Sequence, residues 1–171
     1  MDNAVPFGFL AMPFETQLRK LFDAPFSFRS RPEPIAGDLR MSWGISVLLL
    51  SLLYSRGRKA SFQKLQFLAH SVRIPEGRDD VRSLLRAELR PSDISVRVEP
   101  WLNRAISYAY ALGLVSVHKG KVVSLTDKGL EITGDIQKSG ALAEEGVFLK
   151  EVASKVTDAL LQRIWRMEDL L

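Results

Sequence analysis

Four arginines recur at every fourth residue of one segment and are the first candidates for binding chemistry. They are Arg78, Arg82, Arg86 and Arg90. On a helix, residues four apart share one edge, and like charges at that spacing repel by about 0.2–0.5 kcal/mol per pair. An anion that bridges them would offset this repulsion, and the planar guanidinium suits both phosphate and carboxylate. The candidate anions are a phosphate backbone, an acidic partner surface, or the chain's own Asp79, Glu88 and Asp93.

Further basic residues flank this stripe and extend it as a candidate phosphate-tracking surface. They are Arg56, Arg58, Lys59, Lys119 and Lys121. Residues 41–140 hold 15 basic and 9 acidic side chains, whereas residues 141–171 hold 4 basic and 6 acidic ones. The basic charge therefore belongs to the middle of the chain. Charged turns are most often only solvated, so this reading stays open beside the binding one.

Residues with the spacing of a catalytic or metal site are missing from the sequence. It has no cysteine, and its two histidines, His70 and His118, lie far apart. No phosphate-binding loop, dinucleotide fingerprint or nucleophile elbow occurs. We therefore expect no enzymatic activity, no cofactor and no metal. The lack of cysteine suits a reducing cytoplasm, and the longest apolar run, "ISVLLLSLLY", is too short to span a bilayer.

The elements that would position these residues are mainly helical. Apolar periodicity and breaking residues predict helices from Leu39 to about Gly57, from Ser61 as N-cap to about Val72, over Asp79–Leu89, and from Pro100 to Leu112. "IPEG" is expected to close the second helix, and "ISVRV" at residues 94–98 is expected to form a short strand. Gly113 suits the end of the fourth helix.

A hairpin and a capped helix follow. Residues 114–117 and 121–125 are β-branched runs, and Gly120 supplies the positive φ of a tight turn between them. Thr126 is the expected N-cap of the next helix, with Asp127 near its positive end. The phrase "ALGLV…VSLTDKG" resembles the ending of winged-helix domains. This resemblance implies a mainly α winged helix-turn-helix domain over residues 39–138. The chain departs from that pattern before Pro100: residues 73–98 are favoured as an insertion, and the alternative is that Asp79–Leu89 is itself the second half of the helix-turn-helix.

The helix next to the hairpin, in the recognition position, is aromatic rather than basic. "EPWLNRAISYAYALG" offers Arg104 as its only cation, beside Trp101, Tyr108 and Tyr110. Base-reading helices offer several arginine, lysine, asparagine or glutamine side chains. Aromatic enrichment with few charges is typical of protein interfaces. We expect Trp101 and Tyr108 to contact a partner protein; the alternative is that these rings belong to the core.

Two flanking segments are candidate interaction elements. Residues 1–38 form a Pro/Phe-rich arm, whose repeated "PF" units present Phe7, Phe14 and Phe26 either to this domain or to a partner. Residues 141–171 predict one helix of about 45 Å with a broad apolar arc. The expected interface residues of this helix are Phe148, Val152, Val156, Leu160, Ile164, Trp165 and Met167. The arc either packs on its own domain or mediates homodimeric or heteromeric association.

The overall layout resembles the small middle component of bacterial ABC-three-component (Lamassu-type) antiviral systems. The similarity lies in chain size, the "WGISVLLLSLLYSRG" helix, the "LTDKG" ending and the flanking segments. It implies a non-catalytic adaptor that bridges an SMC- or Rad50-like ATPase and an effector. The resemblance places sequence-independent contact with double-stranded DNA on the four arginines. The alternative is a dimeric winged-helix transcriptional regulator, with the last helix as its dimer seam.

Overall fold

Helices dominate the part of the chain that the structure describes. The computed structural model describes residues 37–168 of 171, which lie within one compact unit, Ile35–Leu171. Phe7, Phe14 and Phe26 lie outside the described residues, and so does the side chain of Met167. The described helices are α2 (Gly37–Leu53), α3 (Phe62–Val72), α4 (Pro75–Leu85), α5 (Pro100–Ala111), α6 (Asp127–Ser139), α7 (Ala143–Val152) and α8 (Asp158–Glu168). The predicted mainly α class is confirmed.

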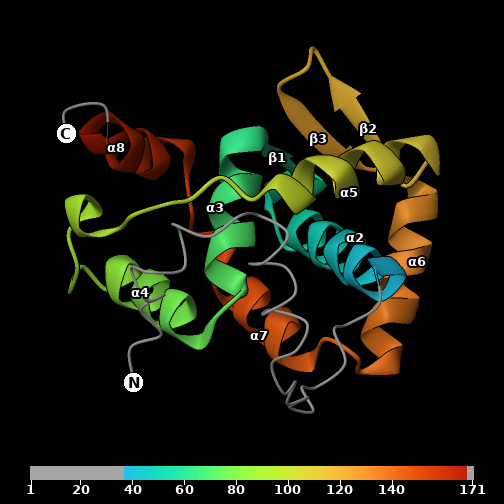
Figure 1. Cartoon of the computed structure of the whole chain (residues 1–171), viewed down its shortest axis with the longest axis horizontal. Coiled ribbons are helices and arrows are strands. Elements are labelled where there is room, and N and C mark those ends of the chain that lie inside the picture. The colour runs from blue at the N-terminus through green and yellow to red at the C-terminus, as the bar shows by residue number, and fades with distance from the viewer. Residues whose placement is uncertain (1–36, 169–171) are drawn as a thin grey trace, which may run out of the picture. The chain divides into compact units, whose positions relative to one another are not determined.

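Helix α2 is the centre of this unit and contacts α3, α5, α6 and α7 (Figure 1). Its apolar residues face two neighbouring clusters, which explains why the helix is apolar on nearly every side. Val47 and Leu50 belong to the cluster with α7 and α8, and Leu48 and Leu49 to the cluster with the sheet. The predicted buried helix is therefore confirmed. Its buried Ser51 hydroxyl donates a hydrogen bond of 2.7 Å to the carbonyl of Val47.

The sheet has three antiparallel strands in the order β1-β3-β2, formed by β1 (Lys59–Ser61), β2 (Val115–His118) and β3 (Val122–Leu125). Strands β2 and β3 make the predicted hairpin. The amide of Lys121 donates to the carbonyl of His118 across the turn, at 3.0 Å. Lys119 and Gly120, the two central residues, both have positive φ, at 49° and 65°. This is the backbone that matches the twist of a two-residue hairpin, and glycine adopts it without strain.

The "LTDKG" segment joins the hairpin to α6 through local contacts. The Thr126 hydroxyl accepts a hydrogen bond from the Gly129 amide at 3.0 Å and donates one to the Gly113 carbonyl at 2.8 Å. Thr126 is therefore the N-cap predicted for this helix. Gly129 packs so closely that a Cβ built there would overlap the carbonyl oxygen of Leu114 and lie 2.9 Å from Cδ1 of Leu125. The requirement for glycine at this position is thus steric.

The last predicted helix is corrected by the structure. Residues 141–171 do not form one continuous helix, because α7 ends at Val152 and α8 begins at Asp158. Ala153 and Val156 in the break are buried in the core, so the chain turns to bury both helices on the same domain. The Thr157 hydroxyl accepts a hydrogen bond from the Leu160 amide at 3.2 Å and begins the new helix.

The segment between α3 and α5 also differs from the prediction. Helix α3 ends at Val72, just before "IPEG", as predicted. The next helix, however, begins within this segment at Pro75 and not at Asp79, with Ile74 as the N-cap and Pro75 in the first turn, where proline is favoured. Residues 94–98 form no strand, since no neighbouring strand pairs with them within the described residues. Val96 is buried there while Val98 is exposed. Helix α5 contacts β2, the strand that follows it in the chain.

Candidate functional site

The outer side of α5 exposes large apolar and aromatic side chains. Leu102, Ala105, Ile106 and Ala109 are buried on its inner side. Tyr108 and Tyr110 lie at opposite edges of this buried side, about 160° apart around the helix, and Leu112 follows the last residue of α5; the three are 55%, 60% and 52% exposed. We call these three residues the α5 patch. Exposed aromatic residues with few neighbouring charges favour contact with a protein over contact with base edges.

A shallow groove separates α5 from the hairpin. It has a volume of about 290 Å³ and is lined by Phe62, Asn103, Ile106, Ser107, Tyr110 and Val117. The groove has no charged side chain in its wall. At its edge, the side-chain amide of Gln66 donates to Oδ1 of Asn103 at 3.2 Å, which fixes the orientation of a polar group that α5 would present to a ligand.

Trp101, predicted to contact a partner, is instead packed within the domain. Its ring lies 5.0 Å from the ring of Trp43, at an interplanar angle of 59°. A Cβ at Gly44 would lie only 2.9 Å from Trp101, so a glycine in α2 allows this approach. Of the two aromatic residues assigned to a partner on this helix, only Tyr108 is exposed. Tyr110, named in the same helix but not assigned to a partner, is exposed as well.

Glu99 holds the start of α5 and was not singled out from the sequence. Its buried carboxylate accepts hydrogen bonds from Trp101 Nε1 at 3.0 Å and Arg73 Nη1 at 3.1 Å, and Nδ1 of His70 lies 3.3 Å away. Its amide donates to Oε1 of Gln66 at 2.9 Å. These contacts connect the end of α3 to the first turn of α5, so Glu99 positions the α5 patch without reaching its surface.

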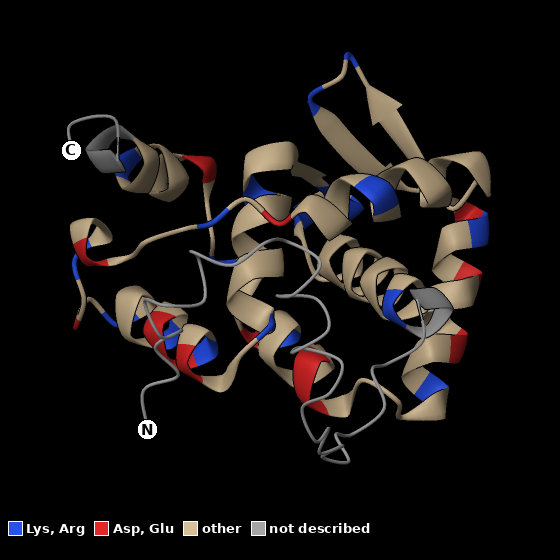
Figure 2. Cartoon of the chain, in the orientation of Figure 1, with Lys and Arg blue, Asp and Glu red and all other residues tan. Residues whose placement is uncertain are grey.

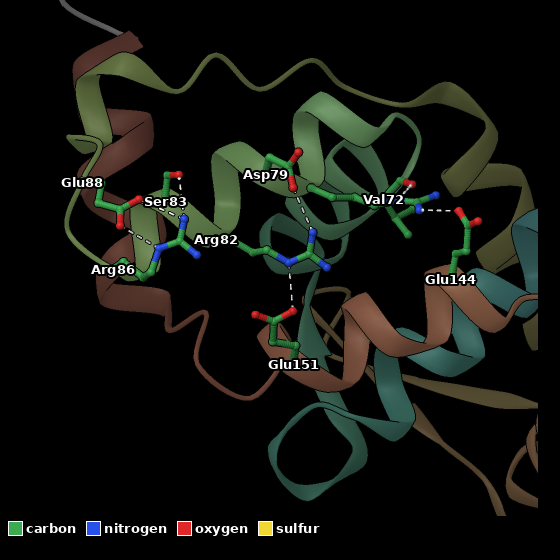
Figure 3. A network of polar contacts seen from close by, with 9 residues as sticks. Val72, Asp79, Arg82, Ser83, Arg86, Glu88, Glu144 and Glu151 are labelled. Carbon is green, nitrogen blue, oxygen red and sulfur yellow. Dashed lines mark hydrogen bonds and ion pairs between the residues drawn. The ribbon is translucent and has the colours of Figure 1, made fainter.

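The four periodic arginines are paired with carboxylates of the chain itself. Figure 3 shows these contacts for Arg82 and Arg86. Arg82 is hydrogen-bonded to Glu151 at 2.9 Å and Asp79 at 3.0 Å, and its guanidinium lies 5.5 Å from the centre of the Phe148 ring. The hydrogen bond to Glu151 is the main reason that the pKa of Arg82 is raised. Arg78 donates to the Val72 carbonyl at 2.9 Å and to Glu144 at 3.2 Å, besides an ion pair with Glu145.

The other two arginines do not continue the predicted edge, because α4 ends at Leu85. Arg86 makes a two-pronged contact with Glu88 at 2.8 and 2.9 Å, which lowers the pKa of Glu88. Arg90 makes hydrogen bonds of 3.2 Å to Asp93, and these lower the pKa of Asp93. The predicted counterions Asp79, Glu88 and Asp93 are therefore confirmed as partners. Glu144 and Glu151 were missed, because they lie 66 and 69 residues from their arginines.

The basic residues predicted outside the stripe keep free side chains. Within the described residues, none of the five makes a side-chain hydrogen bond or an ion pair; they are Arg56, Arg58, Lys59, Lys119 and Lys121. Lys119 and Lys121 lie at the tip of the hairpin, where Figure 2 shows basic residues. Arg56, Arg58 and Lys59 lie where the chain enters β1. Of the basic residues predicted to bind phosphate, those near the sheet are therefore unpaired, whereas those of the periodic stripe are neutralised.

The apolar arc expected to meet a partner at the C-terminal end packs in cis. Phe148, Val152, Val156 and Ile164 are buried in the core, and Leu160 and Trp165 pack partly buried against it. Leu149 and Leu161, which the helical projection did not place on this arc, are buried with them. The arc is thus an internal surface, and in this conformation it offers no seam to a second copy or to another protein.

Residues 37–168 hold neither a metal-binding cluster nor a membrane-crossing helix. This part of the chain has no group of three or more acidic or histidine side chains placed to hold a metal ion. None of its helices combines the length and apolarity needed to cross a bilayer. Comparison with protein-family models, with curated proteins and with solved structures finds no match.

Proposed function

We propose that the chain is a non-catalytic winged-helix adaptor that uses the outer side of α5 to bind another protein. The order of elements supports the winged-helix part of this proposal. Strand β1 lies between α2 and α3 and pairs with β3, and the β2–β3 hairpin follows α5 directly. Helix α5 then has the recognition position, and residues 73–98 are the insertion before it.

The α5 patch is the single observation that carries the proposed function. Three large side chains, Tyr108, Tyr110 and Leu112, are each more than half exposed along the two edges and at the end of the helix that a base-reading protein would place in the major groove. Tyrosine is enriched in protein interfaces because one ring buries a large area at a small entropy cost. Arg104 is the only cation of α5. Such a surface favours a polypeptide ligand over the major groove.

The resemblance to ABC-three-component systems supplies the partner class in this proposal. The α5 patch would bind an SMC- or Rad50-like ATPase, and ATP hydrolysis and effector chemistry would belong to the partners. DNA contact would be weak and independent of sequence, through Lys119 and Lys121 at the hairpin tip. The arginines Arg78 and Arg82 would not take part, since they are bound to carboxylates of α4 and α7.

The test is co-expression of the chain with the products of its flanking genes, followed by size-exclusion chromatography. We expect a stoichiometric complex with a large ATPase, and we expect the double variant Tyr108→Ser, Tyr110→Ser to lose it. The matched control is Val98→Ser, Val147→Ser, because these residues are equally exposed but lie on other elements, at 67% and 65%. This control variant should retain the complex.

A parallel measurement of DNA binding separates the adaptor from the regulator. Fluorescence anisotropy at fixed salt would compare a selected duplex with scrambled duplexes, because affinity without a specificity ratio does not identify a regulator. An adaptor should bind all duplexes weakly and alike. Nanomolar binding of the isolated chain to one sequence, with scrambled competitors ignored, would refute the proposal and identify a regulator.

A further inference from the structure

A second groove lies on another side of the domain, between the edge strand β1 with the start of α3 and the connection from α7 to α8. It has a volume of about 600 Å³, within the range of sites that hold small molecules. The polar side chains of its wall are Arg56, Lys59, Ser61, Lys64, Ser154, Thr157 and Asp158. Three of these are cations and one is an acid, so the wall carries an excess of positive charge.

Lys64 is the unusual member of this wall. The residue as a whole is only 8% exposed, and its ammonium group, which makes no hydrogen bond and no ion pair with any described residue, is open to the solvent of the groove. Buried lysines are normally paired, because removing an ammonium group from water is unfavourable. Burial lowers the pKa of Lys64; Asp158 opposes this effect, and Arg56 adds to it.

The position of Lys64 in its helix makes the charge less favourable still. Its amide donates to the hydroxyl of Ser61, the N-cap, at 3.3 Å, so Lys64 is in the first turn of α3. A cation in the first turn faces the positive end of the helix dipole. Burial, the neighbouring Arg56 and the dipole thus all act against a charged Lys64. An anion bound in the groove would offset these effects, because it would stabilise the charged form of Lys64.

The rest of the wall can take such an anion. Arg56 and Lys59 are exposed at the mouth of the groove and make no side-chain contact within the described residues. Asp158, the acid of the wall, accepts a hydrogen bond from the Ser61 hydroxyl at 2.9 Å and is held by it. Helix α8 begins at this residue, and its positive end adds to the attraction for an anion.

We propose that this groove binds the phosphate group of a small phosphorylated ligand of nucleotide size. Three cations against one carboxylate match a phosphate of charge about −2. A small ligand is favoured over the backbone of a duplex because Lys64 is only 8% exposed, whereas Arg56 and Lys59 are exposed. The phosphates of a rigid double helix would contact the exposed cations and would leave the ammonium group of Lys64 without an anionic partner.

Titration of the full chain with pyrophosphate and with AMP tests this assignment, using isothermal calorimetry at constant ionic strength. We expect saturable binding with one site. Lys64→Met should weaken it by about tenfold or more, since one charge-assisted hydrogen bond is lost. Lys59→Gln, an exposed substitution that leaves the fold unaffected, should weaken it in the same direction, so the test does not depend on the buried variant alone.

Arg104→Gln is the matched control, because it removes one exposed cation from α5, outside the groove. It should leave pyrophosphate binding unchanged. The proposal is overturned if binding is not saturable, if Arg104→Gln weakens it as much as Lys59→Gln does, or if only a 16-base-pair duplex binds in a Lys64-dependent manner. None of these results bears on the α5 patch, so the proposed function is tested separately.

Discussion

Gly129→Ala should lower the free energy of unfolding of the domain more than the addition of a methyl group at any other position of α6. The new Cβ would overlap the carbonyl oxygen of Leu114, which is backbone and cannot rotate away. Relief requires α6 to move from the end of α5 and the start of β2. That movement would stretch the bonds through which Thr126 joins Gly129 to Gly113. The hairpin and the outer side of α5 depend on this junction.

The magnitude follows from three contributions. Overpacking against fixed neighbours costs about 1–3 kcal/mol. The two hydrogen bonds of Thr126, at 3.0 and 2.8 Å, contribute about 1 kcal/mol each. The preference of helices for alanine over glycine returns up to about 1 kcal/mol. We therefore expect the free energy of unfolding to fall by about 3 kcal/mol, which for a domain of this size lowers the Tm by about 6–12 °C.

Gly134→Ala in the same helix is the control. A Cβ at Gly134 meets no atom within 4 Å, and the residue has ordinary helical φ. This variant should gain about 0.5–1 kcal/mol from helix propensity alone. Urea unfolding followed by circular dichroism at 222 nm measures both. If Gly129→Ala and Gly134→Ala unfold within about 1 kcal/mol of each other, the steric reading of "LTDKG" is wrong.

Three further predictions concern the polar contacts, and urea unfolding checks each. Arg82→Ala should lose about 1–2 kcal/mol, because it removes the contacts to α7 and to an aromatic ring, whereas Arg90→Ala, whose side chain is 83% exposed, should change stability by less than about 0.5 kcal/mol. Equal losses would contradict this assignment. Glu99→Ala should lose about 2–4 kcal/mol by leaving Trp101 Nε1 without an acceptor, and Glu99→Gln should lose less, because it keeps one. Lys64→Met should be more stable than the parent at pH 7. In the folded state the pKa of Lys64 lies below its ordinary value of 10.5. Between the folded pKa and 10.5 the unfolded state therefore binds more protons than the folded state, so the free energy of unfolding of the parent should rise with pH. This rise should be absent from Lys64→Met.

The elements predicted correctly are those fixed by neighbours in the chain. Thr126 caps α6 through an amide three residues away, and Gly113 and Gly120 supply positive φ where a helix ends and a hairpin turns. Ser61 caps α3 in the same way. Such signals are carried by residue type and short spacing, so the sequence is sufficient to find them.

The elements predicted wrongly depended on partners far along the chain. Residues 94–98 alternate like a strand, but the edge of the sheet beside β3 is taken by β1. The apolar pattern of residues 141–171 is consistent with one long helix. In the structure the chain turns between α7 and α8, so that Val152 and Val156 are both buried in the core. Thr157 followed by Asp158 repeats the Thr126–Asp127 pattern, and that repeated signal could have located the start of α8.

The two candidate anion sites differ in how far the sequence reveals them: the arginines follow a regular spacing, whereas Lys64 does not. The spacing of four residues in the sequence identified the arginines. Their counterions Glu144 and Glu151, however, lie far along the chain on α7. Because these carboxylates bind the arginines, the surface predicted to bind a ligand is instead a contact between two helices. Lys64 carries no periodic signal at all. Its isolation arises because a turn, a strand and a helix start from different parts of the chain meet around it. A charged side chain that is paired within the folded chain contributes to stability, whereas a buried charged side chain without a partner is unfavourable unless a ligand binds there. By that criterion the groove at Lys64, rather than the arginine stripe, is where this domain is built to receive an anion.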